Sequence, residues 1–257
     1  MKTTIYKLKN SKINNKLRIA LVSDLHGAGF EKIVSALEKS EPDIIAVTGD
    51  ITSRLDATEG EIPPNDYGRP ISHNNAFGLL SECARIAPTF YSLGNHELCG
   101  HKYRENHGRK CRDENLRLIK ESGAVLLDDG FAEFEGIRIG GLTSGLTNSD
   151  LAPKTDWIDD FEKTDAFKLL LCHHPEYYPA YLKKRDIDLV LSGHAHGGQI
   201  VLFGRGLFAP GQGVLPKYTA GTHDGRFVIS RGLCNTAKPI PRLFNPREIV
   251  IIDIEKS

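Results

Sequence analysis

The sequence predicts an α/β fold in which two β-sheets pack together, with helices on the outside. In the first half of the chain, short apolar runs alternate with helical patterns, which is typical of a largely parallel sheet. In the second half, apolar runs follow one another with few helices between them. With 257 residues, 40% of them apolar and 26% charged, the composition is that of a globular protein. We expect a single domain over residues 1–257.

The first half supplies the parallel strands and most of the helices. A helical pattern over Glu31–Lys39, followed by Pro42, lies between the first two apolar runs and predicts a β-α-β unit. Asn75–Ile86 and Arg112–Glu121 also have helical patterns. Five short apolar runs, each ended by polar residues or Gly, predict buried strands: Leu17–Val22, Ile44–Val47, Phe90–Leu93, Leu169–Leu171 and Leu189–Leu191.

The second half adds strands of another kind. Phe131–Phe134 and Ile137–Leu142 flank Glu135-Gly136 and predict a hairpin. Two long segments rich in Gly and Pro, Ile51–Asn74 and Gly204–Thr222, predict irregular loops, and such loops are usually functional or mobile. Further strands are expected at Gln199–Phe203, Arg226–Ser230 and Glu248–Ile254.

Charge and composition limit the classes of partner. Lys plus Arg and Asp plus Glu both total 33, so no chain-wide basic field favours nucleic acid or an anionic membrane. No apolar run approaches the ~20 residues that a membrane span requires. The five cysteines are odd in number and scattered, which predicts reduced thiols. We therefore expect a cytoplasmic protein without a membrane span.

The main functional signal is that polar side chains follow five of the predicted strands. The carboxyl ends of strands in open α/β sheets converge, so these side chains should meet. Residues two apart in extended backbone point the same way, which would bring Asp24 together with His26. The five blocks are Asp24-Leu25-His26-Gly27, Gly49-Asp50, Gly94-Asn95-His96-Glu97, Cys172-His173-His174-Pro175 and Gly193-His194-Ala195-His196.

Carboxylate, imidazole and amide ligands without thiolate favour two ions of Mn, Fe or Zn. Two divalent ions bring four positive charges, against three negative charges from Asp24, Asp50 and one hydroxide. The centre would stay positive and attract phosphate. Two ions roughly 3.5–4 Å apart can share a hydroxide and stabilise in-line displacement, so the pattern predicts hydrolysis of a phosphate ester.

The five blocks, in this order, resemble the calcineurin-like metallophosphoesterase superfamily, whose pattern is D-x-H, G-D, G-N-H-(D/E), H and G-H-x-H. The continuation Gly197-Gly198-Gln199, followed later by Arg231-Gly232-Leu233, looks like the bacterial YaeI-type branch. The resemblance implies a four-layer α/β/β/α sandwich, which agrees with the two sheets expected from the residues. It also implies a dinuclear-metal-dependent phosphoesterase that hydrolyses a small-molecule phosphate mono- or diester by a metal-bridging hydroxide.

By this resemblance, Asp50 bridges two metal ions and His96 faces the leaving group. One metal ion would be bound by Asp24, His26, Asp50 and His196, and the other by Asp50, Asn95, His173 and His194. His174 follows a predicted ligand directly, and an extended backbone would turn it away, so we expect it to support or pack against the site.

Basic residues outside the blocks are candidates for contact with the substrate. We expect Arg54, Arg104 and Arg109 to bind its anionic part, the last two within a basic flap over residues 101–112. A solvated loop is the simpler interpretation of that charge run. A small zinc site is a weaker alternative for the same region, with the candidate ligands Cys99, His101, His107 and Cys111.

Three other functions fit parts of the pattern. A protein phosphatase would explain Arg54 four residues after Asp50, but the paired Gly-His-x-His belongs to the wider phosphoesterases. A nuclease is not favoured by the neutral net charge. A scaffold that has lost catalysis would be expected to lack a ligand or His96, and all eight positions are present. The sequence predicts neither the physiological substrate nor the oligomeric state.

Overall fold

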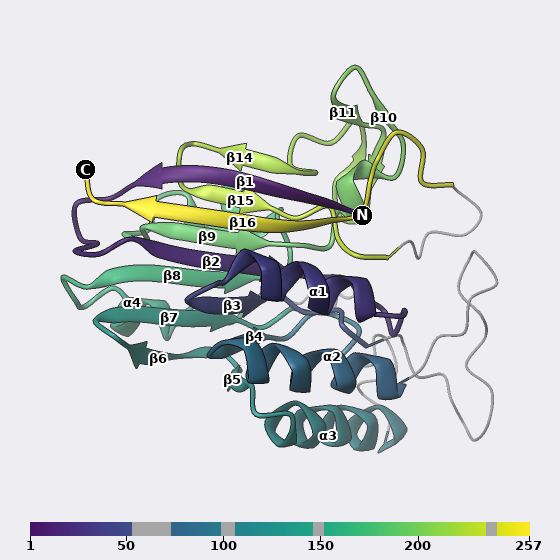
Figure 1. The fold of residues 1–257 in the computed structure, drawn as a ribbon, viewed down its shortest axis with the longest axis horizontal. Coiled ribbons are helices and arrows are strands. Elements are labelled where there is room, and N and C mark those ends of the chain that lie inside the picture. The colour runs from purple at the N-terminus through teal and green to yellow at the C-terminus, as the bar shows by residue number, and fades with distance from the viewer. Residues whose placement is uncertain (53–72, 99–105, 146–151, 235–240) are drawn as a thin grey trace.

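The structure, a computed structural model, describes residues 1–52, 73–98, 106–145, 152–234 and 241–257. Two six-stranded mixed sheets pack face to face, and helices cover their outer faces (Figure 1). This is the α/β/β/α arrangement that the sequence predicts.

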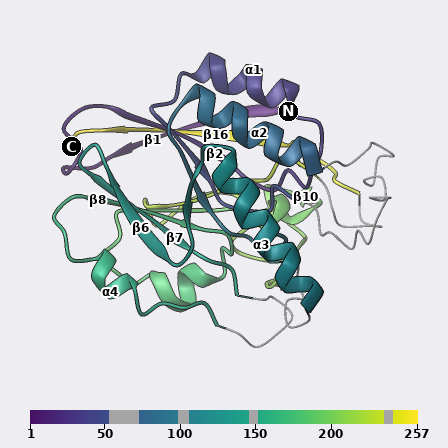
Figure 2. The ribbon, with the colours of Figure 1, turned by 90° about the horizontal axis from the view of Figure 1, so that it is seen from below.

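The first sheet has the strand order β1-β16-β2-β3-β4-β5. Strands β2 to β5 are parallel, β16 is antiparallel to β2, and β1 is parallel to β16 at one edge. Three helices cover its outer face (Figure 2). The strands are β1 (Lys2–Lys9), β2 (Leu17–Val22), β3 (Ile44–Val47), β4 (Thr89–Ser92), β5 (Val125–Leu127) and β16 (Glu248–Glu255). The helices are α1 (Glu31–Ser40), α2 (His73–Ile86) and α3 (Asn106–Glu121).

The second sheet has the strand order β14-β15-β9-β8-β7-β6, with an antiparallel strand at each edge. Helix α4 (Ile158–Phe161) and a π-helical turn at Tyr178–Leu182 cover its outer face. The strands are β6 (Gly130–Phe134), β7 (Ile137–Leu142), β8 (Phe167–Cys172), β9 (Leu189–Ser192), β14 (Gly221–His223) and β15 (Phe227–Ile229). Two short ribbons follow β9: β10 (Val201–Leu202) with β11 (Arg205–Gly206), and β12 (Phe208–Ala209) with β13 (Gly213–Val214).

Burial of the strands on both faces explains their continuous apolar runs. In β2, Ile19 and Leu21 belong to the core between the sheets, whereas Ala20 and Val22 belong to the core beneath the helices. This is the period of two that strand geometry imposes. All four side chains are fully buried. The apolar runs therefore specify a sheet that lies inside the protein.

Some elements differ from the sequence-based expectation. Strand β1 is not predicted from the sequence, because lysines occupy several of its exposed positions and the segment has the composition of a polar chain terminus. Helix α3 begins at Asn106 and not at Arg112, because its first turns lack apolar periodicity. The segment Gly204–Thr222, expected to be irregular, contains short strands, whereas the strand expected at Gln199–Phe203 is reduced to Val201–Leu202.

The expectation of reduced thiols holds in part. Cys83, Cys172 and Cys234 are free and buried, but Cys111 is in a disulfide. Because disulfides are typical of oxidising compartments, the cysteines do not support the expected cytoplasmic location. Among the described residues, no helix has the length and apolarity required to cross a membrane.

Candidate metal centre

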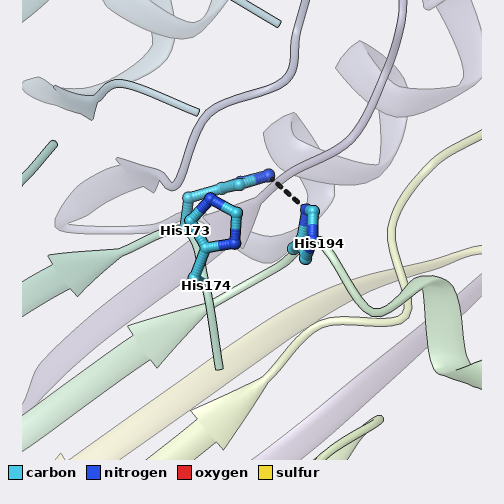
Figure 3. Close-up of side chains that lie close together, drawn as sticks. All are labelled: His173, His174 and His194. Carbon is cyan, nitrogen blue, oxygen red and sulfur yellow. Dashed lines mark hydrogen bonds between the residues drawn. The ribbon is translucent and has the colours of Figure 1, made fainter. Parts of the chain in front are cut away.

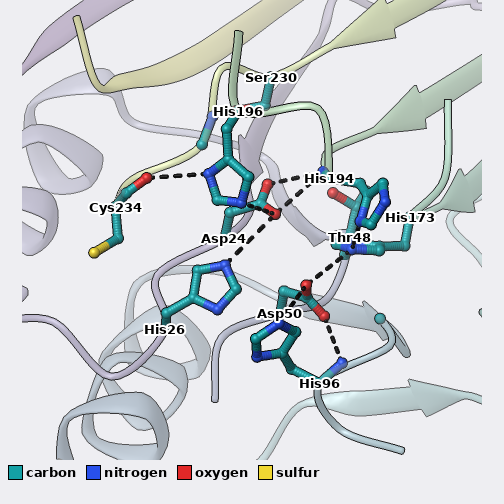
Figure 4. A network of polar contacts seen from close by, with 12 residues as sticks. Asp24, His26, Thr48, Asp50, His96, His173, His194, His196, Ser230 and Cys234 are labelled. Atoms are coloured by element: carbon teal, nitrogen blue, oxygen red, sulfur yellow. Dashed lines mark hydrogen bonds and ion pairs between the residues drawn. The ribbon is translucent and has the colours of Figure 1, made fainter. Parts of the chain in front are cut away.

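The candidate site lies where five strands end. The loops after β2, β3 and β4 of the first sheet meet the loops after β8 and β9 of the second (Figure 4). Backbone hydrogen bonds continue past the strand ends: the N–H of Asp24 donates to the Gly49 carbonyl at 3.1 Å, and that of His26 donates to the Asp50 carbonyl at 3.1 Å. The converging strand ends thus bring the predicted blocks together.

The backbone of these loops is not extended, which corrects one step of the sequence argument. The strands end and the chain turns at once, and five of the eight candidate residues adopt left-handed conformations. Positive φ is uncommon for residues other than Gly, although Asp and His adopt it more often than most, and each such residue costs roughly 1–3 kcal/mol and persists only where its surroundings hold it in place. Such strain is concentrated at functional sites. The residues and their φ angles are Asp24 (57°), His26 (50°), Asp50 (53°), His194 (64°) and His196 (48°).

Two glycines make the close approach of these loops possible. A Cβ atom at Gly193 would lie 1.9 Å from the Ser23 hydroxyl and 2.5 Å from an oxygen of Asp24. A Cβ atom at Gly94 would lie 2.2 Å from an oxygen of Asp50. Both carboxylates therefore occupy space that any other residue at these positions would fill.

Asp24 joins the two sheets. Both of its carboxylate oxygens lie 3.1 Å from the backbone nitrogen of His194, which donates to them. The Nε2 atoms of His196 and His26 lie 3.6 and 3.9 Å from Asp24 Oδ1. The rings of His26 and His196 stack with centroids 5.2 Å apart. A carboxylate and two imidazoles thus surround one point.

Asp50 forms the second half of the cluster. Its Oδ1 accepts the backbone N–H of His96 at 2.8 Å, and its Oδ2 lies 3.1 Å from His173 Nε2. The same His173 nitrogen lies 3.1 Å from His194 Nδ1. The side chain of His96 lies 3.8 Å from Asp50 and is 17% exposed, whereas Asp50 is 2% exposed. His96 is therefore the member of this half that reaches towards solvent.

Backbone carbonyls fix the orientation of two imidazoles. His173 Nδ1 lies 2.6 Å from the Thr48 carbonyl, and His196 Nδ1 lies 3.1 Å from the Cys234 carbonyl. Because a carbonyl can only accept, Nδ1 carries the proton in both rings. In the neutral form of each ring, Nε2 is then the atom that can bind a metal ion, as in metal-binding histidines.

Burial and the neighbouring charges together set the protonation of the cluster. It lowers the pKa of His196, and lowers the pKa of His26 and His194 well below the ordinary value. Burial would raise the pKa of Asp50, but His173 and His96 outweigh it and hold that pKa well below its usual range. Burial would also lower the pKa of His173, but Asp50 and Asp24 raise it to about 10. Metal ions bind ionised carboxylate and neutral imidazole, so His173 would have to release a proton when a metal ion binds.

Several buried polar atoms have no hydrogen-bond partner within the described residues. They are both ring nitrogens of His26, Nε2 of His194 and Oδ1 of Asn95. An unsatisfied buried polar atom costs roughly 1–3 kcal/mol, so this set fits the binding of a cation. Ligand-capable atoms lie within 4.8 Å of one another in the groups Asp24, His26 and His196; Asp24, Asp50 and His173; His26, Asp50 and His96; and His173, His174 and His194.

His174 has polar partners of its own. Its Nδ1 lies 3.1 Å from Glu176 Oε1, and its Nε2 contacts the Ser144 hydroxyl. The ring also packs against His194, with centroids 4.2 Å apart (Figure 3). His174 does not turn away from His173 as expected, because ligand-capable atoms of both rings lie within 4.8 Å of one another and of His194; its supporting role stays a prediction. Ser144 and Glu176 gave no sequence signal, because their contact with His174 arises only in the folded chain.

The candidate substrate residues are largely beyond the described part of the chain. Arg54 and Arg104 lie outside it, and Arg109 lies in α3 with its side chain undescribed. The substrate contacts of these three arginines stay a prediction. Of the alternative zinc site, Cys99 and His101 also lie outside, but Cys111 is in a disulfide, so it has no thiolate to bind zinc and this alternative is not supported.

Comparison with known proteins identifies the family. Residues 17–198 match the calcineurin-like phosphoesterase family. The chain is 32% identical over 250 residues to an uncharacterised metallophosphoesterase of Campylobacter jejuni, covering 96% of this chain and 60% of that protein. It is 26% identical to one of Aquifex aeolicus, covering 97% of this chain and 90% of the relative. The chain therefore belongs to the calcineurin-like phosphoesterase family.

Some relatives are considerably longer than this chain. An uncharacterised metallophosphoesterase of Helicobacter pylori is 27% identical over 203 residues, which cover 75% of this chain and 48% of that protein. The match thus spans about half of its length.

Proposed function

We propose that the protein is a hydrolase that binds two divalent metal ions and cleaves a small-molecule phosphate mono- or diester. The observation that carries the proposal is the buried cluster in which Asp24 and Asp50 face imidazoles from both sheets (Figure 4). Membership of the phosphoesterase family supports the same reaction class. Mn, Fe or Zn suits this donor set.

Asp50 is the proposed bridging ligand. It stands in two of the ligand groups, one with Asp24 and His173 and one with His26 and His96. Asp24, His26 and His196 would complete one metal site, and Asn95, His173 and His194 the other. When bound, two such ions lower the pKa of water and neutralise phosphate oxygens.

His96 is the proposed proton donor to the leaving group. Its backbone N–H is held by Asp50, so the residue is fixed at the edge of the cluster. Its side chain is 17% exposed and its Nε2 lies 3.8 Å from Asp50 Oδ2. An imidazole titrates near neutrality and can deliver a proton at the pH of the cell.

We propose that Arg54, Arg104 and Arg109 bind the anionic part of the substrate that lies outside the metal centre. Contacts made equally in the ground and transition states change KM and not kcat. Replacing Arg104 and Arg109 by Gln should then raise KM several-fold on a large substrate and leave p-nitrophenyl phosphate unaffected. An unchanged KM would leave residues 101–112 as a solvated segment.

A substrate panel tests the proposed function. The purified protein, reconstituted with Mn, would be assayed on p-nitrophenyl phosphate, its bis ester, nucleoside diphosphate sugars, single-stranded DNA and a phosphopeptide. We expect turnover of at least one small ester and its loss in Asp50→Asn. Turnover of DNA alone would indicate a nuclease. Turnover of the phosphopeptide alone would indicate a protein phosphatase. Metal binding without turnover of any substrate would indicate a scaffold.

A further inference from the structure

A group of exposed apolar side chains lies beside the metal centre. The described residues include twelve large hydrophobic residues that are exposed, and seven of them belong to two short segments that follow β9 and β15. Phe203 is 105% exposed, Phe244 is 79% exposed and Val214 is 78% exposed. We call this set the apolar ridge: Leu202, Phe203, Phe208, Val214, Leu215, Leu243 and Phe244.

The apolar ridge is one structural unit. The N–H of Val201 donates to the Leu243 carbonyl at 3.0 Å, and the N–H of Leu215 donates to the Leu207 carbonyl at 2.9 Å. The hairpin of β10 and β11 rises beyond the two sheets (Figure 1). The ridge is also joined to the site, because the N–H of Leu207 donates to the Gly198 carbonyl at 3.1 Å, two residues after His196.

Three ridge residues occupy strained turn positions. Phe203, Leu215 and Phe244 have φ angles of 49°, 51° and 53°. A bulky apolar residue is an outlier in this conformation, which Gly or Asn adopts at lower cost. All three side chains are exposed, so core packing does not account for them. The hairpin turn at Phe203-Gly204 requires positive φ, but no turn requires a bulky apolar side chain, and the presence of Phe and Leu where Gly or Asn would cost less indicates a function for these side chains.

The surrounding charge favours a lipid surface as the partner. Residues 199–217 and 241–247 contain Arg205, Lys217, Arg242 and Arg247 and no Asp or Glu, in a chain of zero net charge. Arg242 and Arg247 donate to backbone carbonyls of the protein. Arg205 and Lys217 are therefore the cations that, together with apolar side chains at separate turn tips, match the interface of a bilayer with anionic headgroups. The core of a protein interface is instead a continuous packed patch. We propose that the apolar ridge inserts into the interface of an anionic lipid membrane.

Vesicle flotation tests this proposal without reference to activity. The protein would be mixed with vesicles of phosphatidylglycerol and phosphatidylcholine in equal parts, or of phosphatidylcholine alone. We expect flotation with the first and much less with the second. The variant Phe203→Asn/Leu215→Asn/Phe244→Asn should lose at least about tenfold in partition, because each apolar side chain removed contributes burial in the interface. Asn suits positive φ, so this variant should fold.

Matched variants separate the contribution of the apolar side chains to membrane binding from that of the positive charges. Ile5→Thr removes an exposed apolar side chain on β1, away from the ridge, and should float like the wild type. Arg205→Gln/Lys217→Gln should weaken binding to the anionic vesicles and reduce its dependence on salt. The proposal is overturned by a wild type that does not float, or by a triple variant that floats equally well. If sedimentation showed a dimer for the wild type and a monomer for the triple variant, the apolar ridge would be a contact between two copies of the chain. That result would also overturn the proposal.

Discussion

The carboxylate of Glu97 lies beneath Asp50 and ties together the loops that follow β3 and β4. Its Oε2 accepts the backbone N–H groups of Asp50 at 2.8 Å and of Gly94 at 2.9 Å. Its Oε1 accepts the N–H of Thr52 at 3.2 Å and the Thr52 hydroxyl at 3.1 Å. Four donors thus converge on one buried acid. Glu97 therefore holds the proposed bridging ligand in its strained conformation.

Glu97→Gln is expected to weaken metal binding. Glutamine keeps one acceptor oxygen, but its NH₂ group would face N–H donors, so the Asp50 loop should loosen. Removal of a group that orients a ligand typically costs 10–100-fold in metal affinity. Titration of the metal-free protein with Mn would measure the loss. Glu82→Gln, at a partly exposed position on α2, is the matched control, and equal affinities for the two variants would show that Glu97 does not position the ligand.

His96→Asn is expected to lower kcat and preserve metal content. General acid catalysis contributes roughly 10²–10⁴-fold, and the other imidazoles of the cluster remain in place. Kinetics on reconstituted protein, with the metal content of the same sample, would measure both effects. An ester with a very good leaving group needs less protonation, so the loss should be smaller on it. Equal losses on good and poor leaving groups would exclude the acid role.

The sequence predicted those parts of the fold in which burial of apolar side chains determines the residue pattern. The run Leu17–Val22 has no alternation because β2 is buried on both faces, so the pattern specifies both the strand and its place inside the sandwich. Strand β1 has no such pattern, because it lies at an edge and only one of its faces packs. Long-range pairing with β16 determines it, and local sequence carries little information about that pairing.

The candidate site was predictable in its members and not in its geometry. The residues that follow five strands meet because parallel strands end at one edge of a sheet. The positive φ of Asp24 and His26 was not predictable, since these residue types usually adopt negative φ. The role of Glu97 was missed for another reason. Its partners Asp50 and Thr52 lie more than forty residues away in sequence.

Stability is expected to fall between about pH 4 and pH 6 through Asp129. Burial is the main cause that raises the pKa of Asp129 from 3.8 to about 6, and Asp128 adds to it. The folded protein therefore holds this proton more tightly than the unfolded chain, so the free energy of unfolding decreases as pH rises through this window. Because the carboxyl is partly exposed, we expect a decrease of only about 1 kcal/mol.

Urea denaturation of the wild type and Asp129→Asn across this pH range would measure the effect. Asn keeps an oxygen that can accept the Thr143 N–H, as Asp129 Oδ1 does at 3.0 Å, and it does not ionise. The stability of the variant relative to the wild type should therefore rise with pH. A constant difference between the two proteins would contradict the shifted pKa.

Gly193→Ala is expected to disrupt the Asp24 half of the metal centre. The added methyl would lie 1.9 Å from the Ser23 hydroxyl and 2.5 Å from Asp24 Oδ2, so Asp24 or the loop after β9 must move. Overpacking of this kind costs typically about 1–3 kcal/mol. Asp24 also accepts the His194 N–H with both oxygens, so a shift would separate carboxylate and imidazole ligands from the two sheets.

The expected outcome is a lower urea midpoint together with less than the wild-type metal content per chain. Gly130→Ala is the matched control, because a Cβ atom there would meet only the Asp128 carbonyl at 3.9 Å. It should retain its metal. If Gly193→Ala bound the full complement of metal with wild-type affinity, Asp24 would not need the space that Gly193 leaves, and its place among the ligands would be contradicted.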